Sequence, residues 1–178
     1  MKIVIGPVRL SYAHIFETHA DLNDNQKYSA SFIIPKKQVK TVAKIENAFK
    51  AMLADKEILN KLGGKTKGVT LPLRDGDTDR SEDAAYADSY FINASANPDR
   101  PPVILSQDRE EVVDKSEVYS GCWVQAVLNL YPYDKGVKRG IGVGLGGIRK
   151  LRDDTPLGGA AVSSDDFDDE DLDDDDLI

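Results

Sequence analysis

The chain has 178 residues, 40% of them hydrophobic, and a formal net charge of −8. This length suits one domain with an appendage. The single cysteine excludes a disulfide framework and a cysteine-based zinc site within one chain. No apolar run approaches the 18 residues of a membrane-spanning helix. The negative charge does not exclude a nucleic-acid partner, because residues 1–152 hold 23 basic and 19 acidic side chains, giving +4, whereas residues 153–178 hold 12 acidic and no basic ones.

The first half of the chain combines strands with one helix. Alternating side chains predict strands over residues 8–16 and 28–34, the second ended by Pro35. Apolar residues at spacings of three, four and seven then predict one amphipathic helix over residues 36–62, ended by two glycines. Residues 65–88 are rich in loop-forming side chains, and a strand is expected over residues 89–96.

The second half reads as strands alone. A short extended stretch over residues 103–105 precedes the clearest strand, residues 121–133, in which Cys122 and every second residue to Leu130 form one apolar face. Residues 138–150 alternate glycine with aliphatic residues, as in a bent barrel strand where backbone or ligand approaches closely. Short strands with one inserted helix indicate a mainly β fold, a small antiparallel barrel or sandwich.

Residues 153–178 are expected to form a disordered acidic C-terminal tail. Ten of the last fourteen residues are acidic, so the segment cannot bury enough apolar surface to offset its chain entropy. Four apolar residues that solubility does not require are predicted to dock on partner proteins: Phe167, Leu172, Leu177 and Ile178. The alternative is a solubilising tail without a partner.

The outward face of the clearest strand suggests single-stranded nucleic-acid binding, which needs exposed rings for base stacking and cations along a groove. Trp123 and Tyr131 share this face with Asn129, and basic residues follow closely. Each ring could instead belong to the core, but rings, polar spacers and cations together favour binding. The candidate DNA-binding residues are Tyr12, Lys36, Lys37, Arg74, Tyr90, Phe91, Asn93, Arg109, Trp123, Asn129, Tyr131, Tyr133, Lys135, Lys138 and Arg139.

Signals for catalysis are poor, and we expect neither an enzyme nor a bound metal or cofactor. His14 and His19 lie five apart, on opposite faces of a regular strand, so they are not expected to form a metal pair. The aspartates at 75, 77 and 79 resemble a calcium loop, but Arg80 and Tyr86 occupy positions where an EF-hand requires glycine and glutamate.

Two other functions remain open. In the first, the acidic tail is the active part and occupies the basic surface of another protein, as a DNA mimic would. In the second, the three aspartates hold the metal of a nuclease.

Seven stretches, in order, resemble the phage single-stranded DNA-binding proteins that pair one oligonucleotide/oligosaccharide-binding (OB) fold with an acidic tail. They read VRLSYAHIFE, YSASFIIPKK, LPLRDGD, YFINASANPDRPPVI, YSGCWVQAVLNLYPYD, KGVKRGIGVGLGGIRKLRD and TPLGGAAVSSDDF. The resemblance implies a five-stranded OB-fold barrel with elaborated loops, decorated by the helix after Pro35. The change in charge along the chain predicts that this domain ends at residue 152.

The same resemblance implies non-sequence-specific binding of single-stranded DNA in phage DNA replication, recombination and repair. It also implies that the tail contacts replication proteins such as a polymerase or helicase. We further expect this tethered polyanion to compete with DNA for the cationic groove, and we expect the protein in the cytoplasm of the host bacterium.

Overall fold

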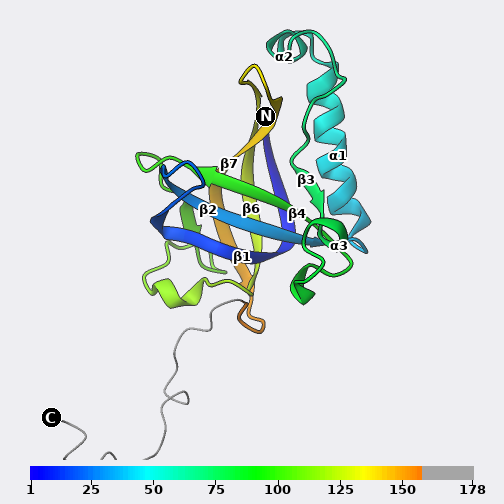
Figure 1. The fold of residues 1–178 in the computed structure, drawn as a ribbon. Helices are drawn as coiled ribbons and strands as arrows, with labels where there is room; N and C mark the ends of the chain where they lie inside the picture. Colours follow the sequence, from blue (N-terminus) through cyan, green and yellow to red (C-terminus); the bar gives the residue numbers. More distant parts are fainter. Residues whose placement is uncertain (158–178) are drawn as a thin grey trace, which may run out of the picture.

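The computed structural model describes residues 1–157 (Figure 1). Most of the predicted disordered tail, residues 158–178, lies outside this range. So do the four residues that are predicted to dock on partner proteins. The strands are β1 (Lys2–Ala20), β2 (Gln26–Pro35), β3 (Leu73–Asp75), β4 (Ser89–Ala96), β5 (Val103–Leu105), β6 (Trp123–Asp134) and β7 (Arg139–Arg152). The helices are α1 (Val39–Ala54), α2 (Lys56–Lys61) and α3 (Gly76–Asp79), with 3-10 turns η1 (Ala84–Tyr86) and η2 (Lys115–Glu117).

Five of the strands close into a barrel. Hydrogen bonds join the strands in the order β3-β4-β2-β1-β6-β7-β5, and a parallel pairing of Ser95 with Gly144 brings β4 onto β7. The closed ring therefore contains β1, β2, β4, β7 and β6, while β3 and β5 extend it. This confirms the expected five-stranded OB-fold barrel with elaborated loops.

The alternation read from the sequence matches the burial of β6. Cys122, immediately before the strand, and Val124, Ala126, Leu128 and Leu130 are at most 1% exposed, and they join one core with side chains from β1, β2, β4 and β7. On β7 the aliphatic residues between the glycines point into the same core. The glycines therefore face outward, which leaves little side-chain bulk on the outer surface of β7.

Strand β1 is longer than predicted, and it bends so that it pairs with two neighbouring strands. Its first part, up to Arg9, pairs with β6, and the part from Arg9 onward pairs with β2. Register shifts interrupt the β2 pairing on both sides of His14, and Tyr12 has a left-handed φ of 45°. These bulges change which side chains share a face.

The single helix predicted over residues 36–62 is in fact two helices. Asp55 leaves the helical conformation, with ψ at 122°, and its carboxylate accepts hydrogen bonds from the backbone N–H groups of Glu57 and Ile58. This N-cap starts α2 in a new direction. The buried face of α1, which includes Ile45 and Phe49, packs onto the barrel, and Figure 1 shows α1 along its side.

The domain continues beyond the expected boundary at residue 152. Leu157 donates its backbone N–H to Ser120 O at 2.8 Å and packs beside Ile33, Tyr86 and Phe91. Residues 153–157, called the 153–157 segment below, therefore belong to the folded body, and the boundary lies at least five residues further on.

Candidate nucleic-acid interface

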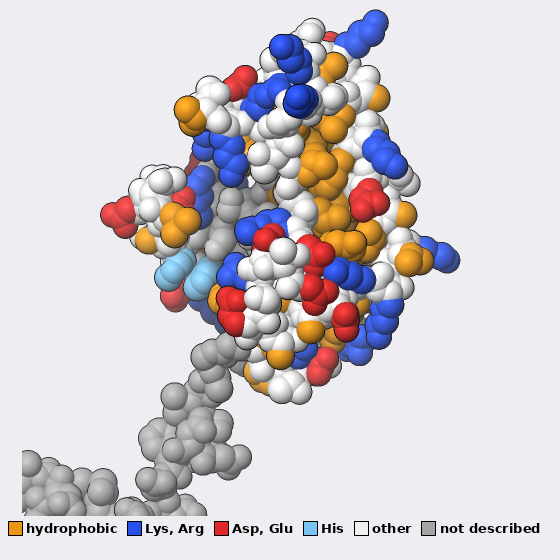
Figure 2. Space-filling view, turned by 45° about the vertical axis from the view of Figure 1, so that its right-hand side comes forward, with side chains coloured by type: hydrophobic (Ala, Val, Ile, Leu, Met, Phe, Trp, Pro, Cys, Tyr) orange, Lys and Arg blue, Asp and Glu red, His pale blue; other side chains and the backbone are white. Residues whose placement is uncertain are grey.

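An open groove of about 750 Å³ crosses the outer surface of the barrel. We call it the tyrosine groove. Six of the predicted residues line it: Tyr12, Arg74, Asn93, Tyr131, Tyr133 and Lys138. Figure 2 shows a hollow in the surface with Lys and Arg side chains around it and the two His side chains at its edge. The fold thus brings together residues that are up to 126 positions apart in the sequence.

Two tyrosine rings of β6 lie over glycines of β7. Tyr131 pairs with Gly142, and a Cβ placed on Gly142 would lie 2.3 Å from Tyr131 Cζ. Tyr133 pairs with Gly140, where such a Cβ would lie 3.0 Å from the tyrosine Oη. The Tyr131 side chain remains 44% exposed, so its ring can take a stacked base. The glycines allow this close approach, in agreement with the expectation that small residues on this strand let other groups come close.

Tyr12 and Arg80 form the second part of the groove. The left-handed bulge presents Tyr12 to solvent, where it is 52% exposed. The Arg80 guanidinium lies 5.4 Å from the Tyr12 ring centroid, and 5.6 and 5.8 Å from those of Phe91 and Tyr86. Three rings therefore hold this cation, and its side chain has no ion pair or hydrogen bond within residues 1–157.

Short polar side chains form the floor of the groove. Ser31 on β2 pairs with Asn93 on β4, and Ser29 pairs with Ser95. Ser31 is nearly buried and its Oγ lies 3.0 Å from Tyr86 Oη, whereas Asn93 is exposed. These small polar residues leave the floor of the groove open and offer hydrogen-bond donors and acceptors along it.

The two histidines stack on each other at the edge of the groove. Their ring centroids are 4.1 Å apart, with 9° between the planes. The prediction that they lie on opposite faces is wrong, because the register shifts around His14 break the alternation. Partial burial, and secondarily the neighbouring His19, lower the pKa of His14 below its usual value. His14 is therefore neutral at neutral pH.

Lys36, Lys37 and Trp123 meet in a separate groove of about 580 Å³, which we call the Trp123 groove. Lys36 already pairs with Asp75 at 2.9 Å and with Asp77 at 2.8 Å. Hydrogen bonds to both carboxylates raise the pKa of Lys36 well above its usual value, so it stays cationic. These three predicted residues are not part of the tyrosine groove.

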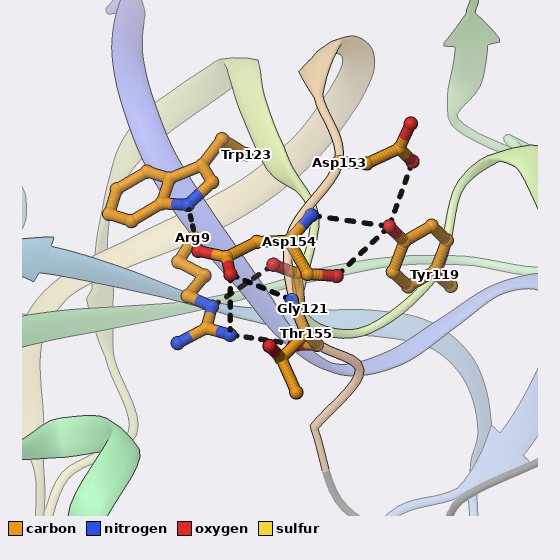
Figure 3. Close-up of polar contacts among 7 residues, drawn as sticks. All are labelled: Arg9, Tyr119, Gly121, Trp123, Asp153, Asp154 and Thr155. Atoms are coloured by element: carbon orange, nitrogen blue, oxygen red, sulfur yellow. Dashed lines mark hydrogen bonds and ion pairs between the residues drawn. The ribbon is translucent and has the colours of Figure 1, made fainter.

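The 153–157 segment holds the Trp123 side chain in place through a hydrogen bond (Figure 3). The indole Nε1 donates to Asp154 Oδ2 at 2.8 Å, and the Arg9 guanidinium donates to Gly121 O and Thr155 O. Tyr119 Oη donates to Asp153 Oδ1 at 2.8 Å. Trp123, predicted to stack on bases, thus has its N–H engaged by the chain itself.

Asp153 and Asp154 are held as carboxylates by these contacts. Hydrogen bonds from Lys150 and Tyr119 lower the pKa of Asp153. A hydrogen bond from Trp123, with smaller effects of Arg9 and Arg152, lowers the pKa of Asp154. At neutral pH both side chains are therefore ionised and able to accept these hydrogen bonds.

Phe91 is a correction to the predicted site. Its side chain is fully buried against Ile33 and Tyr86, so it cannot stack on a base, and its role is to support Arg80 and Arg74 from below. Its neighbour Tyr90 is only partly exposed and has Lys36 at 5.1 Å from its ring centroid. Alternation on β4 places these two residues on opposite faces.

The remaining predicted residues lie in three places. Asn129 is exposed on β6 opposite Gly144, on the same face as Tyr131, and Lys135 lies 6.0 Å from the Tyr133 ring centroid in the β6–β7 turn. Arg139 donates to the carbonyl oxygens of Leu62, Lys65 and Lys67, so its guanidinium holds the loop after α2. Arg109 is exposed in a turn and lines neither groove.

The aspartates considered for a nuclease are engaged in ion pairs. Asp75 and Asp77 bind Lys36, and Asp79 pairs with Arg74 at 3.1 Å. Within residues 1–157 no group of three or more His, Cys, Asp or Glu side chains is arranged to hold a metal ion.

None of the described helices is long and apolar enough to cross a membrane.

Comparison with known proteins places the chain in a family. Residues 1–178 match the family model described as Enterobacter phage Enc34, ssDNA-binding protein. The chain belongs to this family. A relative described as putative protein p50, from Acyrthosiphon pisum secondary endosymbiont phage 1, is 33% identical over 178 residues, covering 95% of this chain and 94% of that protein.

Solved structures of the Enc34 family have the same fold. The single-stranded DNA-binding protein from bacteriophage Enc34, C-terminal truncation, superposes with a TM-score of 0.72 at 25% identity, covering 88% of each chain. The same Enc34 protein in complex with ssDNA gives 0.69 at 24% identity over 88% and 89% of the two chains. The bacteriophage T7 protein gp2.5, also a single-stranded DNA-binding protein, gives 0.58 at 16% identity over 98% and 96%, which shows the fold alone.

Proposed function

We propose that this protein binds single-stranded DNA without sequence specificity in the tyrosine groove. The observation that carries the proposal is the convergence of exposed rings and free cations: Tyr12 and Tyr131 can stack on bases, and Arg80 can pair with a phosphate. Each stacked base contributes about 1–3 kcal/mol. Membership of the Enc34 family, with one solved relative in complex with ssDNA, supports the same ligand.

The mechanism is binding without bond making or breaking. The aromatic rings stack on bases and the cations pair with phosphates. The serine and asparagine side chains on the floor of the groove offer hydrogen bonds that any base can use. Because the folded body has a modest positive charge, stacking supplies much of the affinity, and the phosphate contacts make that affinity fall with rising salt.

We further propose that the acidic residues after 157 compete with DNA for the tyrosine groove. A polyanion tethered to the body has an effective concentration that reaches the millimolar range. DNA binding releases it, and the apolar residues Phe167, Leu172, Leu177 and Ile178 then dock on replication proteins such as a polymerase or helicase. We propose that the protein acts in phage DNA replication, recombination and repair, in the cytoplasm of the host bacterium.

A direct test compares the full chain with a chain ending at Leu157, on single- and double-stranded oligonucleotides over a salt series. We expect both proteins to bind fluorescent oligo-dT, with an affinity that falls steadily as the salt concentration rises. If the chain ending at Leu157 does not bind oligo-dT at low salt, the acidic segment is the active part and the protein is an interaction factor or DNA mimic. Co-precipitation of polymerase or helicase by the full chain, and its loss on truncation, tests the docking role.

A further inference from the structure

The Trp123 groove has the chemistry of a second binding site. Besides Trp123 it is lined by the cations Arg9, Lys36, Lys37 and Arg152 and by one carboxylate, Asp88. Lys37 and Arg152 are exposed, and within residues 1–157 neither forms an ion pair. The lining therefore favours an anion even though Lys36 and Arg9 are already partly neutralised.

An oxyanion of the chain already contacts two residues that line this groove. The Asp154 carboxylate accepts the Trp123 indole N–H at 2.8 Å and lies 3.8 Å from the Arg9 guanidinium (Figure 3). The same donors, an indole N–H and a guanidinium, also bind the oxygen atoms of a phosphate. The contact made by the chain itself thus shows which kind of group this end of the groove accepts.

The aromatic part of the groove suits a base. The Arg152 guanidinium lies 4.6 Å from the Trp123 ring centroid, and the indole remains partly exposed. Aromatic and guanidinium planes are the surfaces on which single-stranded bases stack. Gln38, in the wall of the groove, adds an amide that can bond to a base edge.

The structure assigns to the Trp123 groove a second segment of single-stranded nucleic acid, bound independently of the tyrosine groove. This inference rests on the proposed function for its ligand class. An acidic peptide would use the cations but not the ring face. After Asp154 the described residues 155–157 turn away from this groove, since the Leu157 N–H donates to Ser120 O on the side of the barrel that carries Tyr119.

Residues 75–88 lie between the two grooves: they contribute Arg80 to the tyrosine groove and Asp88 to the Trp123 groove, and they hold six acidic side chains and one arginine. Asp77 and Asp88 are exposed there, and Asp75 lies partly so. Glu82, Asp83 and Asp88, which form no ion pair within residues 1–157, repel a phosphate backbone from this ridge. Two short oligonucleotides should therefore bind one chain at once, and a long strand should reach the Trp123 groove only by passing around the ridge.

The test uses the full chain, whose only tryptophan is Trp123, and an oligo-dT of about six nucleotides, within the ~4–16 that one OB fold binds. We expect a stoichiometry of two oligonucleotides per chain at low salt, with a change in Trp123 fluorescence that follows the weaker event. Lys37→Glu should weaken that event by about tenfold and leave the tighter one unchanged. Lys50→Glu, at an exposed position on α1 that lines neither groove, is the matched control.

Three results would overturn the assignment. The first is one oligonucleotide per chain with unchanged Trp123 fluorescence. The second is a fluorescence change that Lys37→Glu does not alter but Tyr131→Ala removes, since the signal then comes from the tyrosine groove. The third is a fluorescence change on truncation after Leu157 without DNA, which would make the acidic segment the occupant. If the unmodified chain binds no oligonucleotide at all, that result would instead count against the proposed function.

Discussion

The Tyr131 ring lies against Gly142, its cross-strand partner, so closely that a Cβ on the glycine would lie 2.3 Å from Tyr131 Cζ. One strand supplies the ring and the other supplies the space for it. The exposed face of Tyr131 therefore depends on a residue that has no side chain, and this dependence can be measured.

We predict that Gly142→Ala displaces the Tyr131 ring and weakens oligo-dT binding. Gly144→Ala is the matched control, because a Cβ there would meet the nearest atom of Asn129 at an ordinary 3.5 Å. Fluorescence anisotropy should show a loss for the first variant and wild-type affinity for the second. Equal affinities for both variants would mean that the ring position does not matter for binding.

Tyr131→Ala should weaken oligo-dT binding by about 5- to 150-fold, since a stacked base contributes about 1–3 kcal/mol. Tyr131→Phe keeps the ring and should bind nearly as the wild type does. Because the side chain is 44% exposed, we expect little change in the thermal midpoint of either variant. A wild-type affinity for the alanine variant would exclude base stacking on this ring.

Arg80→Ala should weaken binding and reduce the slope of log affinity against log salt by about 1, as expected for one lost phosphate contact. Arg80→Lys keeps the charge but loses the planar stacking on Tyr12, so it should retain the salt slope and recover only part of the affinity. A salt slope that stays at the wild-type value in the alanine variant would show that Arg80 supports the rings without touching the strand.

DNA affinity should increase as the pH falls through the pKa of His14, which lies below the usual histidine value of about 6.5. Burial lowers the pKa of His14, so the free protein holds it neutral, and protonation at lower pH adds a cation at the groove edge. The same shift means that the folded state binds fewer protons than the unfolded chain, so stability falls as the pH falls through the lowered pKa. Titrations at pH 8 and pH 5.5 on wild type and His14→Asn check this: the asparagine variant should lose most of the pH dependence.

Deleting residues 165–178 should tighten single-stranded DNA binding, most strongly at low salt. The deletion removes ten acidic residues, and the Debye length grows from ~10 Å at 0.1 M to ~30 Å at 0.01 M salt. A chain of the same length in which Asn and Gln replace these Asp and Glu residues separates charge from bulk. An affinity that no deletion alters would remove the competition proposal and leave DNA binding intact.

The fold was predictable from the sequence because its signals are local. Alternation and the glycine-rich final strand depend on neighbouring residues, and the resemblance to phage proteins covered most of the chain. The break between α1 and α2 was missed because the apolar spacing continues across Asp55, whose carboxylate starts the second helix.

The site was only partly predictable, because it depends on curvature and register. Trp123 and Tyr131 are both outward on β6, yet eight residues of strand span about 26 Å, and the barrel surface turns over that distance into a different groove. Arg80 and the histidine pair were missed because their positions follow from long-range packing and from bulges that the sequence pattern does not reveal.

The place where the chain is cut decides what a tailless protein reports. A truncation after Arg152 would remove more than the acidic residues: Arg9 and Trp123 would lose their partners Asp154 and Thr155, and Gly121 would lose the backbone that lies against it. Such a protein would lack both the acidic residues and the contacts that residues 153–157 make with the barrel, so its DNA affinity would report two changes at once. Truncation after Leu157 separates the two effects, and only then does a gain in DNA affinity measure the acidic residues alone.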